Sequence, residues 1–258
     1  MSDTAPKPIL ALENLHKSLG GRKVLQGVTL DVAPGRSLVI LGGSGAGKSV
    51  TLKCALGLME ADSGRVMVEG REVTHLRGSE RKRANQSFGM LFQGGALFDS
   101  LRIWENVAFR LLYAEKVPRR QAKERALETM RRVRLGPEHA EKFPIELSGG
   151  MQKRASLARA IIARPKILFF DEPTTGLDPI TADAINNLIV EMVKDLGCAA
   201  VSITHDITSA EKIGDEIAML YEGRIIWRGP AVALRSSGDA RVDQFVHGRS
   251  EGPIAALV

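Results

Sequence analysis

The sequence predicts an α/β protein with a parallel sheet at its core. Two observations predict this class. Apolar runs of strand length occur at residues 37–43 (SLVILGG), 166–170 (KILFF) and 198–204 (CAAVSIT), and they are continuous, as in strands buried on both faces. Segments with helical periodicity alternate with these runs, which is typical of a parallel α/β core.

The first hundred residues contain further strand-like segments and one helix. The strand-like segments lie between turn residues, and they are residues 9–19, 23–35, 64–73 and 88–93. The helix follows a glycine-rich loop and is expected from Lys48 to Leu58. We therefore expect an antiparallel β layer beside the parallel core.

The rest of the chain alternates helices and strands. Residues 103–134 have a helical pattern in which apolar side chains recur at helical spacing, namely Ala122, Ala126, Met130 and Val133. Further helices are expected after Ser148, at 180–197 and at 207–214, and a final hairpin at 216–230. Residues from about 100 to 163 then form a helical insertion into the core.

Composition is that of a globular protein without a membrane span. Of the 258 residues, 44% are hydrophobic and 26% charged. The apolar runs are far shorter than the roughly 20 residues that cross a bilayer, and residues 1–8 lack the pattern of a secretory signal. Cys54 and Cys198 have neither metal-ligand spacing nor a disulfide framework. We therefore expect a cytosolic chain in a reducing compartment.

The formal net charge of +6 leaves three interpretations open. It indicates a solvated basic surface, attraction to an anionic membrane face, or attraction to nucleic acid. The densest basic cluster, residues 77–83 (RGSERKR), has no aromatic side chains to stack on bases, and aromatics make up 5% of the chain. No nucleic acid is therefore expected as a partner.

Residues 42–49 (GGSGAGKS) fit the phosphate-binding pattern G-x-x-x-x-G-K-[ST] between a predicted strand and a predicted helix. Glycines let successive backbone N–H groups turn toward phosphate oxygens, and the helix N-terminus adds partial positive charge. The Lys48 ammonium can reach the β- and γ-phosphates, and the Ser49 hydroxyl can bind Mg²⁺. The predicted nucleotide-binding residues are Gly42, Gly43, Ser44, Gly45, Ala46, Gly47, Lys48, Ser49 and Val50.

Polar side chains end three of the apolar strands. Asp171 and Glu172 end the strand at 166–170, at the sheet edge where ligands of α/β proteins bind. Asp171 suits a Mg²⁺ shell, and Glu172 suits a base that polarises an attacking water. Gln93 and His205 end two other strands. Each alone is better explained as an ordinary surface residue, but their order together with the phosphate-binding loop and the Asp-Glu strand favours a shared site.

These motifs together resemble a known family. The phosphate-binding loop, Gln93, residues 147–154 (LSGGMQKR), 169–172 (FFDE), 176–178 (GLD) and His205 occur in the order found in ATP-binding cassette (ABC) ATPases. The resemblance covers about residues 8–230. It implies a P-loop NTPase (RecA-like) core with an antiparallel β subdomain and an inserted α-helical subdomain.

The resemblance also implies a division of the chain. One ABC ATPase domain spans residues 1–258, with the core and β subdomain at 8–99 and 164–232. The helical subdomain takes residues 100–163, and residues 239–258 form a C-terminal extension.

The same resemblance implies a head-to-tail homodimer with ATP at its interface. The signature residues that would meet the partner's γ-phosphate are Ser148, Gly149, Gly150 and Met151, and Asp178 would lie at the dimer interface. The catalytic residues implied are Glu172, His205, Gln93 and Lys48. The Mg²⁺ ligands implied are Ser49, Gln93 and Asp171.

Two positions depart from the family pattern. Met151 replaces the commoner glutamine of the signature, and we expect little loss because the preceding residues make the phosphate contact. Leu19 stands where an aromatic residue usually stacks on adenine. Because a leucine lacks the stacking increment, we expect modest ATP affinity and weak discrimination between bases.

Three segments also resemble the MlaF subgroup, the ATPases of Mla phospholipid transporters, which are close to the ATPases of other MCE-protein systems. They are residues 92–109, the LSGGM signature and the tail 238–254. The resemblance implies an MlaE-like permease, an MCE-domain (MlaD-like) protein reached through it, and a small STAS-domain (MlaB-like) protein. It also implies a peripheral place on the cytoplasmic face of a bacterial inner membrane.

Two segments allow more than one interpretation. The apolar residues after Gln93 are either core of the helical insertion or a groove for a permease helix, and they are Leu97, Phe98, Leu101, Ile103 and Trp104. In the tail, Val242, Phe245 and Val246 recur at helical spacing. They pack either on their own domain or on a sibling subunit or regulator.

Three functions remain in competition: an ATPase subunit for lipid transport, one for importing another solute, and a soluble ABC ATPase of repair, translation or cluster assembly. The single cassette, the short insertion and the isolated cysteines disfavour the third. The tail and the segment after Gln93 favour lipid.

Overall fold

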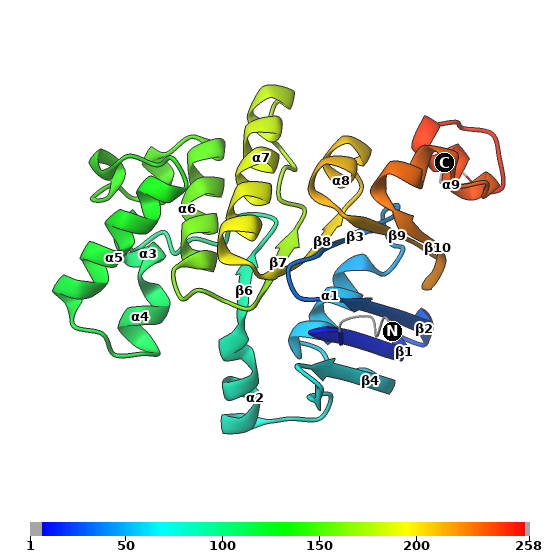
Figure 1. The fold of residues 1–258 in the computed structure, drawn as a ribbon, viewed down its shortest axis with the longest axis horizontal. Coiled ribbons are helices and arrows are strands. Elements are labelled where there is room, and N and C mark those ends of the chain that lie inside the picture. The colour runs from blue at the N-terminus through cyan, green and yellow to red at the C-terminus, as the bar shows by residue number, and fades with distance from the viewer. Residues whose placement is uncertain (1–6, 256–258) are drawn as a thin grey trace, which may run out of the picture. The chain divides into compact units, whose positions relative to one another are not determined.

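The structure is a computed structural model that describes residues 7–255 (Figure 1). Its chain divides into two compact units, one of Met1–Asn85 with Ala199–Val258 and the other of Gln86–Cys198. We call them unit 1 and unit 2. Residues 1–6, which belong to the segment examined for a secretory signal, lie outside the described residues. So do residues 256–258, at the end of the predicted 239–258 extension.

Unit 1 contains two sets of strands, in the orders β2-β1-β4-β5 and β10-β9-β3-β8. The strands are β1 Leu10–Leu19, β2 Arg22–Val32, β3 Ser37–Leu41, β4 Ser63–Val68, β5 Arg71–Glu72, β8 Ala199–Thr204, β9 Glu216–Tyr221 and β10 Arg224–Pro230. β3 runs parallel to β8 and β9, whereas β1 is antiparallel to β2 and β4, and β9 to β10. The predicted antiparallel layer, parallel core and final hairpin are confirmed.

The helices of unit 1 are α1 Lys48–Leu56, α2 Gly78–Ala84, α8 Ile207–Ile213, the 3₁₀ helix η4 Ala231–Ser236 and α9 Ala240–His247. α1 ends two residues earlier than predicted, because Gly57 takes a left-handed φ of 66° and its N–H caps the helix. The sequence did not predict α2, which is formed by the basic cluster. The Arg81 guanidinium anchors α2 by donating to the carbonyls of Val73, Thr74 and Leu76.

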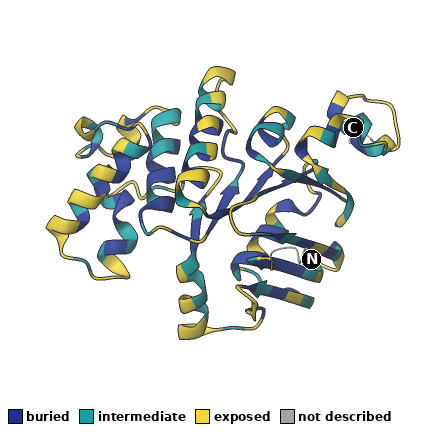
Figure 2. Cartoon of the chain, in the orientation of Figure 1, coloured by how far each residue is buried: buried dark blue, intermediate teal, exposed yellow. Residues whose placement is uncertain are grey.

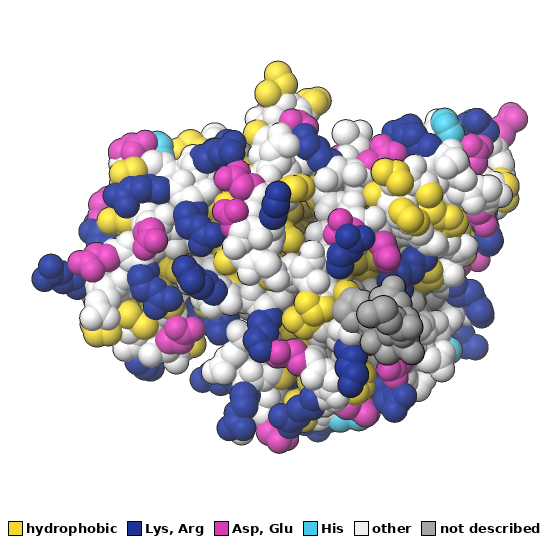
Figure 3. All heavy atoms as spheres, in the orientation of Figure 1, with side chains coloured by type: hydrophobic (Ala, Val, Ile, Leu, Met, Phe, Trp, Pro, Cys, Tyr) yellow, Lys and Arg dark blue, Asp and Glu magenta, His cyan; other side chains and the backbone are white. Residues whose placement is uncertain are grey.

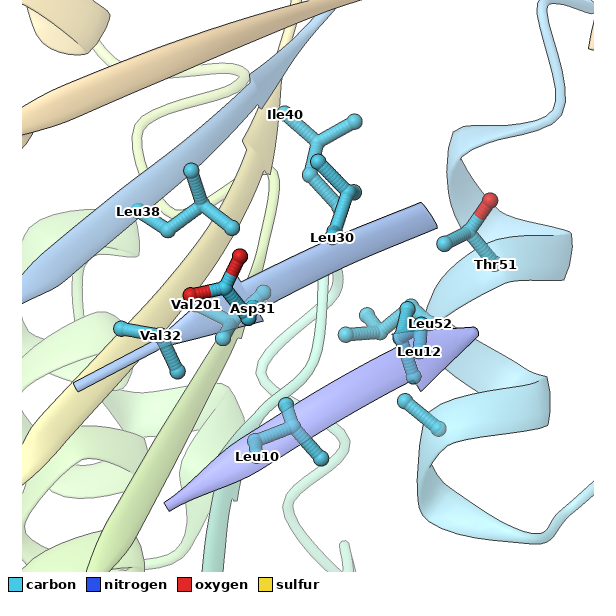
Figure 4. A pocket seen from close by; sticks show the side chains of 11 residues that line it. Leu10, Leu12, Leu30, Asp31, Val32, Leu38, Ile40, Thr51, Leu52 and Val201 are labelled. Atoms are coloured by element: carbon cyan, nitrogen blue, oxygen red, sulfur yellow. The ribbon is translucent and has the colours of Figure 1, made fainter. Parts of the chain in front are cut away.

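Apolar side chains from β1, β2, β3, α1 and β8 point toward one another in the core of unit 1 (Figure 4). The cavity left between Leu12, Leu30, Ile40 and Leu52 is about 10 Å³. A void of this size barely accommodates one water molecule. The contact is therefore a packed core that fixes α1, and with it the end of the glycine loop.

Unit 2 contains the strands β6 Phe88–Leu91 and β7 Ile167–Asp171, which pair in parallel. Helices separate the two strands along the chain and follow the second one. These helices are α3 Ile103–Val107, α4 Phe109–Tyr113, α5 Arg119–Arg132, η2 Pro137–His139, η3 Pro144–Glu146, α6 Gly149–Ile161 and α7 Pro179–Leu196. The short helix η1 Asn85–Ser87 begins at the last residue of the first segment of unit 1 and continues into unit 2. The prediction that the strand ends at Gln93 is wrong by two residues. β6 stops at Leu91, and the chain then turns, with the Gly95 N–H donating to the Phe92 carbonyl at 2.8 Å.

The apolar segment after Gln93 divides between core and surface (Figure 2). Ile103 and Trp104 are buried, as are Ala126 and Met130 of α5, so this part is core. Phe98 is 44% exposed. The core interpretation therefore holds for Ile103 and Trp104, and the permease-groove interpretation stays a prediction for the exposed part of the segment.

The charges on the surface are mixed. On the face shown in Figure 3, Lys and Arg side chains are interspersed with Asp and Glu over both units. Interspersed charges produce no extended field of one sign on that face. Among residues 7–255, no helix is long and apolar enough to span a membrane.

Candidate nucleotide site

The phosphate-binding loop of unit 1 leaves the carboxyl end of β3 and enters α1. Its last glycine, Gly47, is the N-cap of α1 and has a φ of 110°. A Cβ there would lie 2.9 Å from Leu25 Cδ2 and 3.1 Å from the Val24 carbonyl oxygen. Only glycine fits this backbone and this space, so the loop can approach β2 and open a helix N-terminus toward a ligand.

Lys48 lies over the loop and is 8% exposed. Its ammonium donates to the Gly42 carbonyl at 2.6 Å and to the Gly43 carbonyl at 3.0 Å. These bonds hold the charge at the loop opening, where the β- and γ-phosphates of a nucleotide would lie. Ser49, the next residue, is exposed in the first turn of α1, and Val50 is half-buried.

His205 leaves the sheet at the same edge as the loop. β3 and β8 are parallel and Leu41 pairs with Thr204, so the residues that follow each strand emerge side by side. The turn after β8 is fixed by two contacts: the Asp206 N–H donates to Thr204 Oγ1 at 3.0 Å, and the Asp206 carboxylate caps α8. The structure thus places His205 and the loop at the same edge of the sheet.

Leu19 lies at the tip of the β1–β2 hairpin in unit 1. It pairs with Arg22 across the two-glycine turn and is 42% exposed. Its side chain is therefore available to a ligand.

In unit 2, Gln93 and the two carboxylates leave one sheet edge. β6 and β7 are parallel and Leu91 pairs with Phe170. Gln93 and Glu172 therefore follow the carboxyl ends of neighbouring strands, and Asp171 is the last residue of β7. Glu172 is 8% exposed and has a φ of 47°, which is unusual for a residue with a side chain. Its Oε2 accepts a hydrogen bond from Thr175 Oγ1 at 3.0 Å. A strained backbone and a fixed carboxylate are typical of a functional position.

The signature segment opens α6 as the sequence predicts. Ser148 is the N-cap, and its Oγ accepts from the Met151 N–H at 3.4 Å. Ser148 and Gly149 are exposed, so this helix N-terminus is open to an anion. The segment around Asp178 lies against it, since a Cβ at Gly150 would meet Thr181 Cγ2 at 2.8 Å.

Asp178 caps α7 with a charged carboxylate. It accepts from the Ile180 and Thr181 N–H groups at 3.1 and 3.0 Å. Hydrogen bonds from Thr181 hold the pKa of Asp178 below its ordinary value. The side chain is exposed, beside the signature helix.

Sequence reasoning missed the polar side chains on the inner face of α6. Lys153, Ser156 and Arg159 donate to backbone carbonyls of the turn after β6. Burial lowers the pKa of Lys153, opposed by the carboxylates of Asp171 and Glu172. The available signal was three polar residues spaced by three on a helix that is otherwise apolar toward its core.

The candidate Mg²⁺ ligands all offer the hard oxygens that this ion prefers. They are the Ser49 hydroxyl, the Gln93 side-chain carbonyl and the Asp171 carboxylate. Magnesium sites commonly combine one or two carboxylates with phosphate and water oxygens. The chemistry of these donors therefore fits Mg²⁺ beside a nucleotide.

The glycine loop between β3 and α1, with Lys48 over it, defines a P-loop nucleotide-binding protein. The chain belongs to the ABC transporter family, whose model matches residues 25–175. It is therefore an ATP-binding cassette and an ATPase, the nucleotide-binding subunit of an ABC transporter.

The chain is similar to several ATP-binding proteins of transporters and to a solved structure of an ATP-binding cassette. The chain is 36% identical to the probable ribonucleotide transport ATP-binding protein mkl of Mycobacterium leprae, over 95% of this chain and 70% of that protein. It is 34% identical to the intermembrane phospholipid transport system ATP-binding protein MlaF of Haemophilus influenzae, over 95% and 93%. It is 40% identical to the methionine import ATP-binding protein MetN of Carboxydothermus hydrogenoformans, over 86% and 66%.

The dimeric post-hydrolysis structure of the cassette MJ0796, bound to ADP and Pi, superposes with a TM-score of 0.79 at 30% identity. It covers 86% of this chain and 98% of that one. The predicted α/β cassette fold is confirmed.

Proposed function

We propose that this chain powers the transport of phospholipid or a related lipid between the inner and outer bacterial membranes, through a separate permease. The similarity to MlaF carries the proposal, because it extends over 95% of this chain and 93% of MlaF. At that coverage it includes the segment after Gln93, whereas the match to MetN covers 86% of this chain and 66% of that protein.

In this proposal the P-loop binds the phosphates of ATP. The loop amides, of which Ser44 and Gly45 are exposed residues, and the N-terminus of α1 supply positive potential. Lys48 exchanges its bonds to the Gly42 and Gly43 carbonyls for bonds to phosphate oxygens. Leu19 packs on the adenine. Mg²⁺, held by Ser49, Gln93 and Asp171, would neutralise charge on the β- and γ-phosphates.

Glu172 is the proposed general base. Its carboxylate accepts the proton of the attacking water, and the bond from Thr175 orients the other oxygen. His205 and Lys48 donate to the γ-phosphate and stabilise the charge that develops on it. Gln93 would contact the γ-phosphate and Mg²⁺, and its place in the chain just before Phe98 would couple it to the permease.

A homodimer completes each site in this proposal. The exposed Ser148 hydroxyl and the Gly149 and Gly150 amides would bind the γ-phosphate held by the partner's P-loop. Asp178, beside the signature helix, would lie at the dimer interface. ATP then acts as part of the dimer contact, and hydrolysis releases it.

The proposed permease contact is an aromatic surface on unit 2, formed by the exposed rings of Phe98 and Tyr113 and the half-buried ring of Phe109. The rings of Phe98 and Phe109 stack with centroids 4.5 Å apart, and those of Phe109 and Tyr113 are 4.7 Å apart. Buried Asn106 fixes the backbone of Phe98, accepting from its N–H at 2.7 Å and donating to its carbonyl at 3.0 Å. Tyr113 is 49% exposed. Rigid, exposed aromatic side chains are typical of interface anchors.

The test is to purify the tagged chain from its native cells in mild detergent and identify the proteins and lipids that accompany it. We expect an MlaE-like permease, an MCE-domain protein, phospholipid and, where the system has one, a STAS-domain protein. The variant Phe98→Ser/Tyr113→Ser should lose the permease. The matched control is Val232→Ser, at a residue that is 94% exposed on unit 1.

The second candidate function is import of another solute, such as an amino acid, which the 40% identity to MetN favours. A permease that co-purifies with a solute-binding protein and without an MCE-domain protein would establish this alternative and remove lipid as the cargo. Absence of any membrane protein would contradict both.

A further inference from the structure

Side chains on one face of α6, the helix that begins at the signature, donate hydrogen bonds to the turn that contains Gln93. Lys153, Ser156 and Arg159 are spaced by three along α6 and therefore project from the same side. Lys153 Nζ donates to the Gln93 carbonyl, and Ser156 Oγ donates to the Gly95 carbonyl at 2.9 Å. Arg159 donates to the Gly95 and Ala96 carbonyls at 2.7 and 2.6 Å.

The turn is shaped for these contacts. Gly95 and Ala96 have φ values of 75° and 46°, which direct their carbonyls toward α6 instead of along a strand. A Cβ at Gly95 would lie 2.8 Å from Ser156 Oγ, so the turn and the helix are in close contact. Ser156 is fully buried, and Lys153 is 6% exposed. Burying an ammonium is unfavourable unless hydrogen bonds compensate, so these carbonyls are required partners of Lys153.

Lys153 has a second partner at the other strand end. Its Nζ lies 3.4 Å from the Glu172 carbonyl. The same carbonyl accepts from the Thr175 N–H at 3.3 Å, in the turn that orients the Glu172 carboxylate. One ammonium thus joins the backbones of the residues that follow β6 and β7, from a position on α6 five residues after Ser148.

We propose that Lys153 is a positioning residue that fixes the backbones of Gln93 and Glu172 to the signature helix. Its chemical role rests on the proposed function of Glu172 and Gln93 in hydrolysis. A movement of α6 on formation of the ATP-bound dimer would then be transmitted directly to the general base and to Gln93. Lys153 donates its hydrogen bonds to backbone carbonyls, and in this proposal its side chain neither binds ATP nor takes part in proton transfer.

The test compares Lys153→Met, which keeps the unbranched length and removes the charge, with Lys153→Arg, which keeps a cation. Arg154→Met is the control, since Arg154 lies next along α6 and donates to the carbonyl of Arg134. Two readouts are needed. One is steady-state hydrolysis with ATP affinity, and the other is hydrogen exchange of the Gly95 and Thr175 amides, whose bonds close the two turns.

We expect Lys153→Met to lower kcat on the order of tenfold or more, because small displacements of catalytic groups have large effects on rate. Its Kd for ATP, measured with a fluorescent ATP analogue, should stay within about twofold, since no ATP contact is removed. Exchange at Gly95 and Thr175 should accelerate together. Lys153→Arg should recover most of both properties, and Arg154→Met should match the original protein.

Unchanged exchange at both amides in Lys153→Met would overturn the proposal, as would a normal kcat with accelerated exchange. If Lys153→Met fails to fold, Ser156→Ala removes one neutral bond from the same face and should accelerate exchange at Gly95 with a smaller loss in kcat. Exchange does not depend on hydrolysis. Accelerated exchange in Lys153→Met together with normal turnover by Glu172→Gln would therefore locate the failure in the proposed function instead.

Discussion

At the scale of single residues, Glu172 combines burial, a positive φ and a carboxylate held by Thr175. Glu172→Gln keeps the shape and the hydrogen-bond acceptor but removes the base. We expect ATP binding to persist and hydrolysis to fall by about 10²–10⁴-fold. A phosphate-release assay measures the rate, and size-exclusion chromatography with ATP should show accumulation of dimer.

The matched control for this variant is Glu222→Gln, an exposed glutamate that also has a positive φ, of 45°. It should hydrolyse ATP at the original rate. Hydrolysis by Glu172→Gln at a rate close to that of the control would contradict the assignment of the general base.

Leu19 sets a second prediction at this scale. The side chain is 42% exposed at the hairpin tip and can cover only part of a purine. Leu19→Tyr should tighten ATP binding by about 2–10-fold, since aromatic stacking adds roughly 0.5–1.5 kcal/mol. Calorimetric titration with ATP measures this, and Leu58→Tyr, at a residue 61% exposed elsewhere in unit 1, is the control. If the original protein hydrolysed GTP far more slowly than ATP, the prediction of weak base discrimination would fail.

At the scale of elements, local signals were predicted well and long-range contacts were not. The N-cap at Ser148 and the strand before Asp171 depend on adjacent residues, so the sequence was sufficient to place them. The end of β6 at Leu91 depends on a turn held by α6, and Lys153 lies 60 positions from Gln93. No pattern within a short window contains such a contact, which is why both the strand end and the Lys153 face were missed.

The tail was expected to pack either on its own domain or on a sibling subunit or regulator, and the structure shows contacts within its own unit. Val242 and Val246 of α9 are buried, and the buried Gln244 amide bonds both N–H and carbonyl of Ile254, at 2.7 and 2.9 Å. The helix therefore packs within unit 1. Phe245 reaches the P-loop, where its ring lies 3.9 Å from the position of a Cβ on Gly43.

These contacts predict separate effects for two neighbouring side chains of α9. Val242→Ala should lower the free energy of unfolding by about 1–3 kcal/mol, measured by urea denaturation, because it leaves a buried cavity. Phe245→Ala, at a half-buried residue, should instead weaken ATP binding by a few-fold, because it removes a support of the loop. Equal ATP affinity for Phe245→Ala and the original protein would show that the contact has no role in binding.

At the scale of the whole molecule, the arrangement of two chains decides which helix N-terminus serves which P-loop. Lys48→Ala disables a P-loop and Ser148→Arg disables a signature. In a head-to-tail dimer with C2 symmetry, pairing one variant chain with the other combines both defects in one site and leaves the second site intact. Doubly tagged heterodimers should therefore hydrolyse ATP at about half the original rate, although each variant alone is inactive.

Placing both substitutions on one chain, instead of one on each chain, provides the control for this prediction. A chain that carries both Lys48→Ala and Ser148→Arg, paired with an unmodified chain, places one defect in each site and should be inactive. If instead the signature served the P-loop of its own chain, the outcomes would exchange: the doubly substituted heterodimer would keep about half the rate and the first would have none. Because both heterodimers contain the same side chains, differences in folding cannot produce this exchange. The two rates therefore report directly on whether the exposed N-terminus of α6 acts on the nucleotide of a second subunit.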